Sequence, residues 1–174
     1  MKTVNPRLLN LGGFLACAGM MAYALYAEYV LYLMPCPLCS FQRLGVVLMG
    51  IVFLAATLHN PMQWGRRVYA GLVALATAVA AGVAGYHVWM QGLPEDEVPS
   101  CGPGLGYMME TLPILEVLKT VFTGSGSCVE IDWEFLGLSM PGWVLVLALL
   151  LGLMGLWNNL RRLPARDELR LAVK

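Results

Sequence analysis

The sequence predicts an all-α membrane protein built as a bundle of four transmembrane helices, and three observations support this fold class. Hydrophobic residues make up 59% of the 174 residues and charged residues 13%, about half the share of roughly 25% in soluble domains. Four long stretches contain no Asp, Glu, Lys or Arg. The basic residues are distributed unevenly among the segments between these stretches. A chain of this composition must expose much of its surface to lipid.

The four uncharged stretches give the expected spans. We place them at residues 9–28, 42–58, 68–90 and 141–159 of a single integral membrane domain that covers residues 1–174. A helix needs about 20 apolar residues to cross the hydrocarbon core. Only helices and closed barrels satisfy their backbone groups in lipid. These stretches are too long and too evenly apolar for barrel strands, so we expect helices.

The first two spans have features of their own. The first could be a cleaved signal peptide, because Lys2 and Arg7 precede its apolar core. Its apolar run exceeds the usual signal core of about 7–15 residues, which favours a retained helix. The second span is the shortest, because the sequence HNP at residues 59–61 ends its helix near Leu58.

The basic residues predict the orientation of the bundle, since Lys and Arg gather on the cytoplasmic side of membrane proteins. Of the eleven, only Arg43 and Lys119 fall outside in a four-span arrangement. The other nine fall on the opposite side: Lys2, Arg7, Arg66, Arg67, Arg161, Arg162, Arg166, Arg170 and Lys174. We therefore expect both termini in the cytoplasm and two outer loops at residues 29–41 and 91–140. The zero net charge gives no sign of a nucleic-acid partner.

The second outer loop contains one amphipathic stretch, GYMMETLPILEVLKTVF at residues 106–122. Its apolar residues recur at steps of three and four, which is the helical period. They are Met108, Met109, Leu112, Leu115, Leu118 and Phe122. We expect a short helix that lies on the membrane surface and is kinked or restarted at Pro113.

Four of the five cysteines fall in the outer loops. Cys36 and Cys39 form a C-x-x-C motif in the first loop, while Cys101 and Cys128 lie in the second. Disulfides persist in an oxidising outer compartment. Cys17 lies among small residues of the first span, ACAGMM, and is expected to be a packing residue.

The spacing of the cysteines favours redox chemistry over a metal site. A zinc ribbon needs two C-x-x-C pairs, whereas the second pair is widely separated and no His neighbours either pair in sequence. No metal is therefore predicted. Cys101–Cys128 could be a structural disulfide that staples the loop. Cys36–Cys39 would close too small a loop to remove much chain entropy, so a pair that is alternately oxidised and reduced is favoured.

Two features of the sequence around Cys39 favour electron transfer from this residue. The cysteine lies near the start of the second helix, where the helix dipole favours a thiolate. Arg43 follows by four residues and therefore shares its helix face, where a guanidinium could polarise an acceptor oxygen or serve as an interface anchor. The chain lacks C-x-x-C-H and G-x-G-x-x-G motifs for haem or dinucleotide binding. A lipid-dissolved quinone is the acceptor that this location favours.

The chain resembles the DsbB family in its ordered set of motifs. These are PCPLCSFQR at residues 35–43, the two spaced cysteines of the second outer loop, and GSGSCVEIDWEFLGLSMPGW at residues 124–143. The resemblance covers nearly the whole chain except the tails. It implies a multi-pass protein of the bacterial inner membrane that reoxidises DsbA, a periplasmic oxidant with the thioredoxin fold.

The resemblance also implies roles for individual residues. Reduced DsbA would attack the Cys101–Cys128 disulfide and form a mixed disulfide with Cys101. Electrons would then pass to Cys36–Cys39 and from the Cys39 thiolate to ubiquinone or menaquinone, on the periplasmic side. Three residues are implied to lie near the quinone: Arg43, His87 and Trp133. By position alone, His87 and Trp133 are also typical of an aromatic interface belt.

Two alternative functions remain open: one belongs to another enzyme family, and the other belongs to a class of proteins that are not enzymes. A relative of vitamin K epoxide reductase would also couple four helices, a C-x-x-C and loop cysteines to a quinone. In that family the loop pair precedes the C-x-x-C, whereas here the C-x-x-C comes first. A four-span assembly or binding protein with purely structural disulfides is the other alternative.

Overall fold

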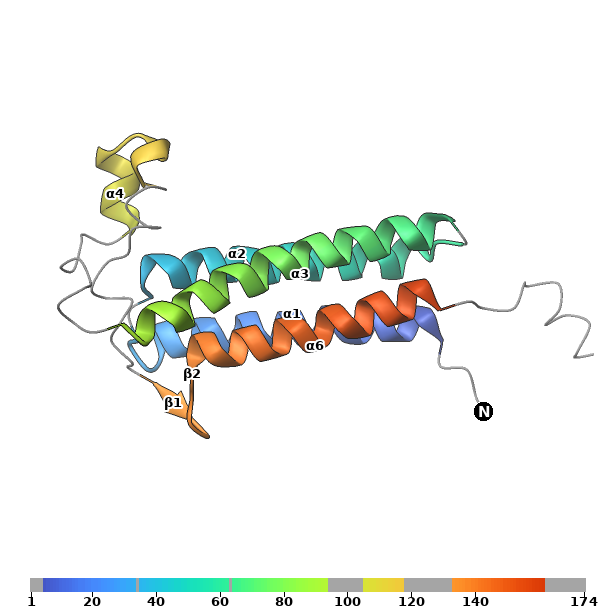
Figure 1. The fold of residues 1–174 in the computed structure, drawn as a ribbon, viewed down its shortest axis with the longest axis horizontal. Helices are drawn as coiled ribbons and strands as arrows, with labels where there is room; N and C mark the ends of the chain where they lie inside the picture. Colours follow the sequence, from blue (N-terminus) through green and yellow to red (C-terminus); the bar gives the residue numbers. More distant parts are fainter. Residues whose placement is uncertain (1–4, 34, 63, 94–104, 118–132, 162–174) are drawn as a thin grey trace, which may run out of the picture.

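Four long helices form the body of the protein, as the sequence predicts. The computed structural model describes residues 5–33, 35–62, 64–93, 105–117 and 133–161. The helices are α1 (Pro6–Tyr29), α2 (Pro37–His59), α3 (Trp64–Gln91) and α6 (Met140–Leu160). They lie side by side as an elongated bundle (Figure 1), and each is long and apolar enough to cross a membrane.

Local sequence signals set where the helices begin and end. Helix α2 begins with Pro37, whose fixed φ suits the first helical position. It ends at His59, after which Asn60 adopts a left-handed conformation with φ 44° and ψ 58°. Helix α1 likewise begins with a proline, and the side chain of Asn5 accepts a hydrogen bond from the Arg7 amide at 3.0 Å.

The centre of the bundle is packed around Phe53 of α2, which is fully buried. Glycines make room for its ring, since a Cβ at Gly155 would approach it to 2.8 Å and one at Gly13 to 3.0 Å. Small residues at helix contacts allow the close approach that packing in lipid requires. Cys17 lies in the same core with 3% of its surface exposed, as its small neighbours indicate.

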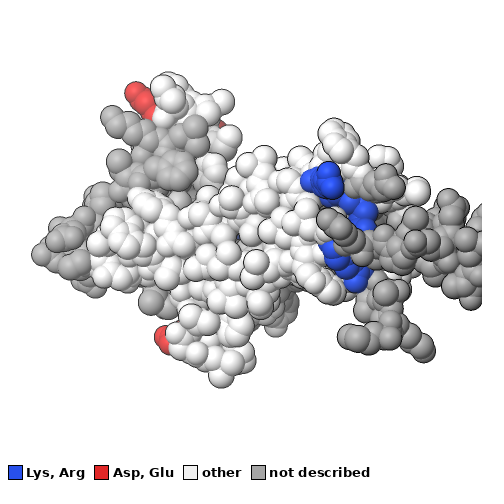
Figure 2. All heavy atoms as spheres, turned by 45° about the vertical axis from the view of Figure 1, so that its right-hand side comes forward, with Lys and Arg blue, Asp and Glu red and all other residues white. Residues whose placement is uncertain are grey.

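A polar cluster joins three helices at the end of the bundle where the chain enters α1 and α3 and leaves α6. This asparagine cluster consists of Asn10, Arg66, Asn158 and Asn159, all buried. Asn158 donates to the Asn10 side chain at 3.0 Å and to the Pro6 carbonyl at 2.9 Å, and Arg66 donates to the Asn158 carbonyl. Figure 2 shows Lys and Arg side chains gathered near one end of the visible face and acidic side chains near the other.

The amphipathic stretch is helical but interrupted. Helix α4 (Leu105–Thr111) ends before Pro113, and helix resumes at residues 114–117, so the predicted break at the proline is confirmed. Residues 118–122 lie outside the described residues. Val117 is 4% exposed and packs with Leu38 and Met90. Part of the stretch therefore covers the bundle beside the C-x-x-C, while its place on a membrane surface stays a prediction.

A short hairpin leads into the last helix and was not anticipated from the sequence. Strand β1 (Glu134–Phe135) pairs antiparallel with β2 (Leu138–Ser139). Its turn uses positive φ at Leu136 (53°) and Gly137 (77°). The Trp143 indole donates to the Phe135 carbonyl at 3.0 Å, which ties the hairpin to α6.

Candidate active site

The two cysteines of the C-x-x-C motif lie at the first turn of α2. Cys36 is the N-cap residue, and its sulfur accepts a hydrogen bond from the Cys39 amide at 3.2 Å. The two Sγ atoms are 2.8 Å apart. A disulfide requires about 2.0 Å, so the bond could form between them with little movement. Because the pair caps a helix, the positive end of the helix dipole can stabilise negative charge on sulfur.

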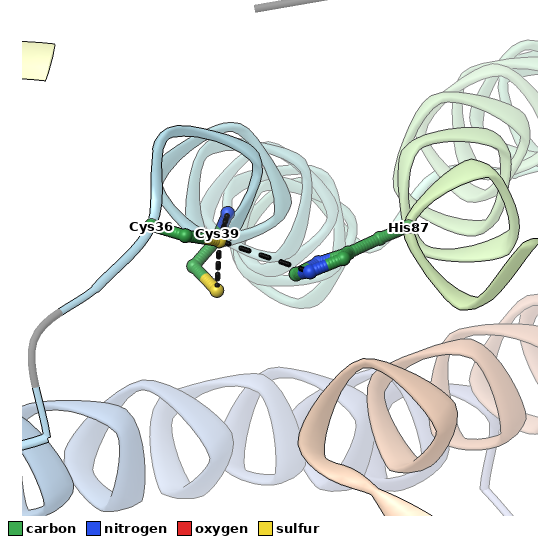
Figure 3. Close-up of side chains that lie close together, drawn as sticks. All are labelled: Cys36, Cys39 and His87. Carbon is green, nitrogen blue, oxygen red and sulfur yellow. Dashed lines mark hydrogen bonds between the residues drawn. The ribbon is translucent and has the colours of Figure 1, made fainter. Parts of the chain in front are cut away.

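His87 of α3 points toward this pair of sulfur atoms (Figure 3). Its Nε2 lies 3.8 Å from the Cys36 Sγ, and 2% of the residue is exposed. The Nδ1 atom lies 2.8 Å from the Nε2 of Gln42, which is also buried. With the amide nitrogen as donor, Nδ1 accepts and the neutral ring carries its proton on Nε2. That proton is then directed at the sulfur atoms.

Arg43 is held by α1 one helical turn beyond Cys39. Its Nη1 forms an ion pair with the Glu28 carboxylate, and its Nη2 donates to the Ala24 carbonyl at 3.2 Å. The two charged side chains are 24% and 23% exposed. A pair of this kind fixes the guanidinium and leaves no net charge on the two groups together.

These side chains line one cavity between the ends of the four long helices. The space between these side chains is about 880 Å³, a volume that includes space open to solvent. Five predicted site residues contribute to its wall: Cys36, Cys39, Arg43, His87 and Trp133. Most of the remaining wall is apolar, from residues such as Met20, Met21, Val46, Met140 and Val144.

Aromatic contacts hold Trp133 at the wall of the cavity. Its ring meets Tyr23 of α1 edge to face, with 5.9 Å between centroids, and stacks on Phe135 at 6.1 Å. The hairpin therefore brings the segment before α6 against α1. The position of Trp133 beside the cavity agrees with the expectation that it lies near a bound acceptor, but its role stays a prediction.

The other predicted pair lies outside the described residues. Cys101 and Cys128 fall in segments 94–104 and 118–132, so their pairing and their exchange with a partner stay predictions.

Sequence reasoning missed two polar residues of the site, Glu28 and Gln42. The sequence alone assigns no role to Glu28 or to Gln42. Both had a signal in the sequence, because each is a polar residue at or within a mostly apolar segment, where such groups need partners. Their partners lie on other helices, 15 and 45 positions away in the chain, so only the packing of the helices identifies them.

The arrangement suits two-electron thiol chemistry beside an apolar binding site. Two sulfur atoms lie within bonding reach, the Cys39 amide and His87 surround them, and a fixed guanidinium lies on the same helix. Hydrogen-bond donors and a cation at such a site can stabilise charge that develops on sulfur or on an acceptor oxygen.

A family model and individual related proteins identify the same family for this chain. The model of the family described as "Disulfide bond formation protein DsbB" matches residues 6–158, which include nearly all of the four long helices. Disulfide bond formation protein B of Nitrosococcus oceani is 52% identical over 146 residues, 84% of this chain and 86% of the relative. The protein of that name from Marinobacter nauticus is 50% identical over 157 residues, 90% of this chain and 94% of the relative. No solved structure gives a significant match.

Proposed function

Because the chain belongs to the DsbB family of membrane disulfide bond formation proteins, we propose that it reoxidises a DsbA-like periplasmic protein and passes the electrons to a membrane quinone. One observation carries the proposal: the C-x-x-C pair, Arg43, His87 and Trp133 line a single apolar cavity. The order of the cysteine pairs in the chain and the family membership both favour this function over that of an enzyme like vitamin K epoxide reductase.

The first half of the proposed reaction is thiol–disulfide exchange. A thiolate of the reduced partner attacks the Cys101–Cys128 disulfide, which forms a mixed disulfide with Cys101 and releases Cys128 as a thiolate. The second thiol of the partner then displaces Cys101, so the partner leaves oxidised and both loop cysteines are reduced. The reduced loop cysteines then exchange with the Cys36–Cys39 disulfide, so the Cys101–Cys128 disulfide forms again and Cys36 and Cys39 become thiols.

The residues of the cavity fit a quinone head group. When bound, a quinone supplies an acceptor of two electrons and two protons, which allows Cys36 and Cys39 to return to a disulfide. Apolar side chains of the wall suit a flat ring and exclude water. Arg43 can donate to a carbonyl oxygen, and such a charge-assisted bond strengthens as negative charge grows on that oxygen.

Two further residues act through these groups in the proposal. Glu28 is a positioning residue, because its ion pair with Arg43 fixes the guanidinium at the cavity wall. Gln42 is also a positioning residue, because its bond to His87 Nδ1 selects the ring form that presents an N–H to sulfur. Neither needs to touch the acceptor to affect it.

A quinone is an acceptor of suitable strength for such a partner. DsbA has a reduction potential of about −120 mV, so its reoxidation requires a strongly oxidising sink. A difference of about 30 mV changes a two-electron equilibrium tenfold. A quinone pool kept oxidised by respiration can therefore pull both disulfide exchanges forward.

The proposed orientation places the cavity at the periplasmic face of the bacterial inner membrane. It is supported by the uneven distribution of Lys and Arg. In the part of the chain that the structure describes, Arg7, Arg66, Arg67 and Arg161 belong to the helix ends opposite the C-x-x-C. Basic residues near helix ends mark the cytoplasmic side.

The deciding experiment is quinone reduction by the purified full-length protein, with reduced DsbA as the donor and ubiquinone or menaquinone as the acceptor. We expect catalytic loss of quinone absorbance coupled to DsbA oxidation. The quinone with the higher kcat/KM identifies the preferred acceptor. Oxidation of DsbA without either quinone beyond what the two disulfides of the protein can accept, or no oxidation with both quinones, would contradict the proposal.

A further inference from the structure

We propose that Cys36, Cys39 and His87 form a binding site for a thiophilic divalent cation such as Zn²⁺ when the two cysteines are reduced. The Sγ atoms and a ring nitrogen of these residues all lie within 4.8 Å of one another. One of the two reasons for which the sequence predicts no metal is that no His lies near either cysteine pair in the chain. The fold removes that argument, since α3 brings His87 to Cys36 across 51 positions.

The distances from the Cys36 sulfur to its two neighbours can be compared with those of a tetrahedral site. Zinc bonds of about 2.3 Å to sulfur and 2.0–2.1 Å to nitrogen place tetrahedral ligand atoms roughly 3.5–3.8 Å apart. The distance from Cys36 Sγ to His87 Nε2 is 3.8 Å and already suits this geometry. The two sulfur atoms, 2.8 Å apart, would have to separate by about 1 Å, which a small side-chain rotation can supply.

Gln42 can support the imidazole as a metal ligand. Coordination through Nε2 requires the ring proton on Nδ1, and histidine ligands usually donate that proton to a neighbouring acceptor. The Gln42 amide, whose nitrogen lies 2.8 Å from Nδ1, can turn over and present its oxygen instead. An amide offers both a donor and acceptor, so one side chain serves the metal-free and the metal-bound ring.

The charges of the site also balance. On binding, both thiols release their protons to solvent, and the two thiolates neutralise the charge of the cation. Arg43 adds no net charge, because Glu28 compensates it. A neutral complex avoids most of the cost of placing an ion in a low-dielectric region. Three protein ligands leave a fourth position for water, as in open zinc sites.

Binding must depend on the redox state of the pair. A disulfide offers no thiolate, so only the reduced protein binds the cation, and no electron is transferred when it does. Bound Zn²⁺ would hold both sulfur atoms and prevent their return to a disulfide. This consequence rests on the proposed function, whereas cation binding by the reduced pair does not.

Cobalt titration of the reduced protein tests the site directly. The Cys101→Ser/Cys128→Ser protein, purified in detergent without quinone and reduced with a phosphine, retains only Cys36, Cys39 and the buried Cys17. Co²⁺ is the probe, because thiolate-bound tetrahedral Co²⁺ has distinctive absorption. We expect one Co²⁺ per chain, displaced by Zn²⁺, and no such absorption after the pair is oxidised. Cys17→Ala should change nothing.

Variants of the other residues separate this site from a site made by thiols alone. His87→Leu should weaken Co²⁺ binding by more than the roughly 10- to 100-fold that loss of an outer partner costs. Gln42→Met should weaken it by about that amount. Gln42→Glu, whose carboxylate accepts from Nδ1, should instead tighten binding. Alkylation of the reduced cysteines confirms that each variant keeps an accessible pair.

Two results would overturn the inference. One is the lack of thiolate-to-cobalt absorption in the reduced protein, and the other is equal affinity in the parent, His87→Leu and Gln42→Met proteins. The proposed function is tested separately by quinone reduction with DsbA in the presence of a chelator. Failure of that assay leaves the cobalt titration unaffected, and the reverse also holds.

Discussion

The two ends of the bundle both bury polar side chains, but they use them differently. In the asparagine cluster, the buried amides of Asn10, Asn158 and Asn159 bond mainly to one another and to backbone carbonyls. At the other end, Gln42 and His87 are equally buried, yet their hydrogen bond lies beside a cavity. Polar groups that only join helices can pack tightly, with no cavity beside them. Polar groups that act on a ligand must leave room for it.

The partners of the arginines show the same difference. Arg66 donates to the backbone carbonyl of Asn158, so its guanidinium ties α3 to α6. Arg43 ties α2 to α1 through Glu28 and the Ala24 carbonyl, but it also lines the cavity. Both are expected to contribute to stability, and only Arg43 is expected to affect catalysis.

The largest expected effect at the cavity end follows Cys36→Ser. Serine is a strong N-cap residue, so its oxygen can replace the sulfur as acceptor for the amide of residue 39 and the start of α2 is preserved. Quinone reduction should fall to the uncatalysed background, while the melting temperature should change little. Measurable turnover in folded Cys36→Ser would contradict the role of this pair.

Arg43→Gln is expected to have the next largest effect. Loss of a desolvated charge-assisted hydrogen bond costs about 1.5–3 kcal/mol, so kcat/KM for quinone should fall roughly 10- to 150-fold. A quinone titration at saturating reduced DsbA measures this. Formation of the Cys101 mixed disulfide should persist.

Arg66→Gln is the matched control at the other end. It loses a buried bond between helices, so its melting temperature should fall while its KM for quinone stays the same. Quinone kinetics of Arg43→Gln that equal those of Arg66→Gln would mean that Arg43 is only an interface anchor.

Glu28→Gln should have a smaller effect, and it tests whether the charge of Glu28 positions the Arg43 guanidinium. The amide keeps an acceptor for Arg43 but removes the charge, and neutral hydrogen bonds are weaker than charged ones by about 1 kcal/mol. We expect kcat/KM for quinone to fall roughly fivefold. Glu28→Asp keeps the charge on a shorter side chain and should recover part of this loss. Equal losses in both variants would argue against a role of the charge.

The smallest expected effect overall belongs to Asn10→Ala in the asparagine cluster. The substitution removes the acceptor of two hydrogen bonds from α6, and such bonds in membrane proteins contribute on average about 0.6 kcal/mol each. The melting temperature in detergent should fall slightly, with quinone kinetics unchanged. A large change in KM would show that the two ends of the bundle are coupled.

The four long helices and the C-x-x-C motif could be predicted from the sequence alone. Spans are readable because length and hydropathy are properties of contiguous residues, and the break at Pro113 follows from a ring that cannot continue a helix. The relation of Cys36, Cys39 and Arg43 is also local, since they share the first two turns of one helix. The hairpin before α6 was missed because two-residue strands leave too little pattern to detect.

Which residues of different helices meet at the cavity could be learned only from the packing of the helices. His87 was expected near the acceptor from the family resemblance alone, and its contacts with Cys36 and Gln42 come from the packing of α2 against α3. The pairing of Glu28 with Arg43 depends in the same way on how α1 turns its face toward α2. An apolar composition is enough to favour a helix in lipid, but it does not set the rotation of that helix about its own axis. Close packing and the need to pair buried polar groups then fix that rotation.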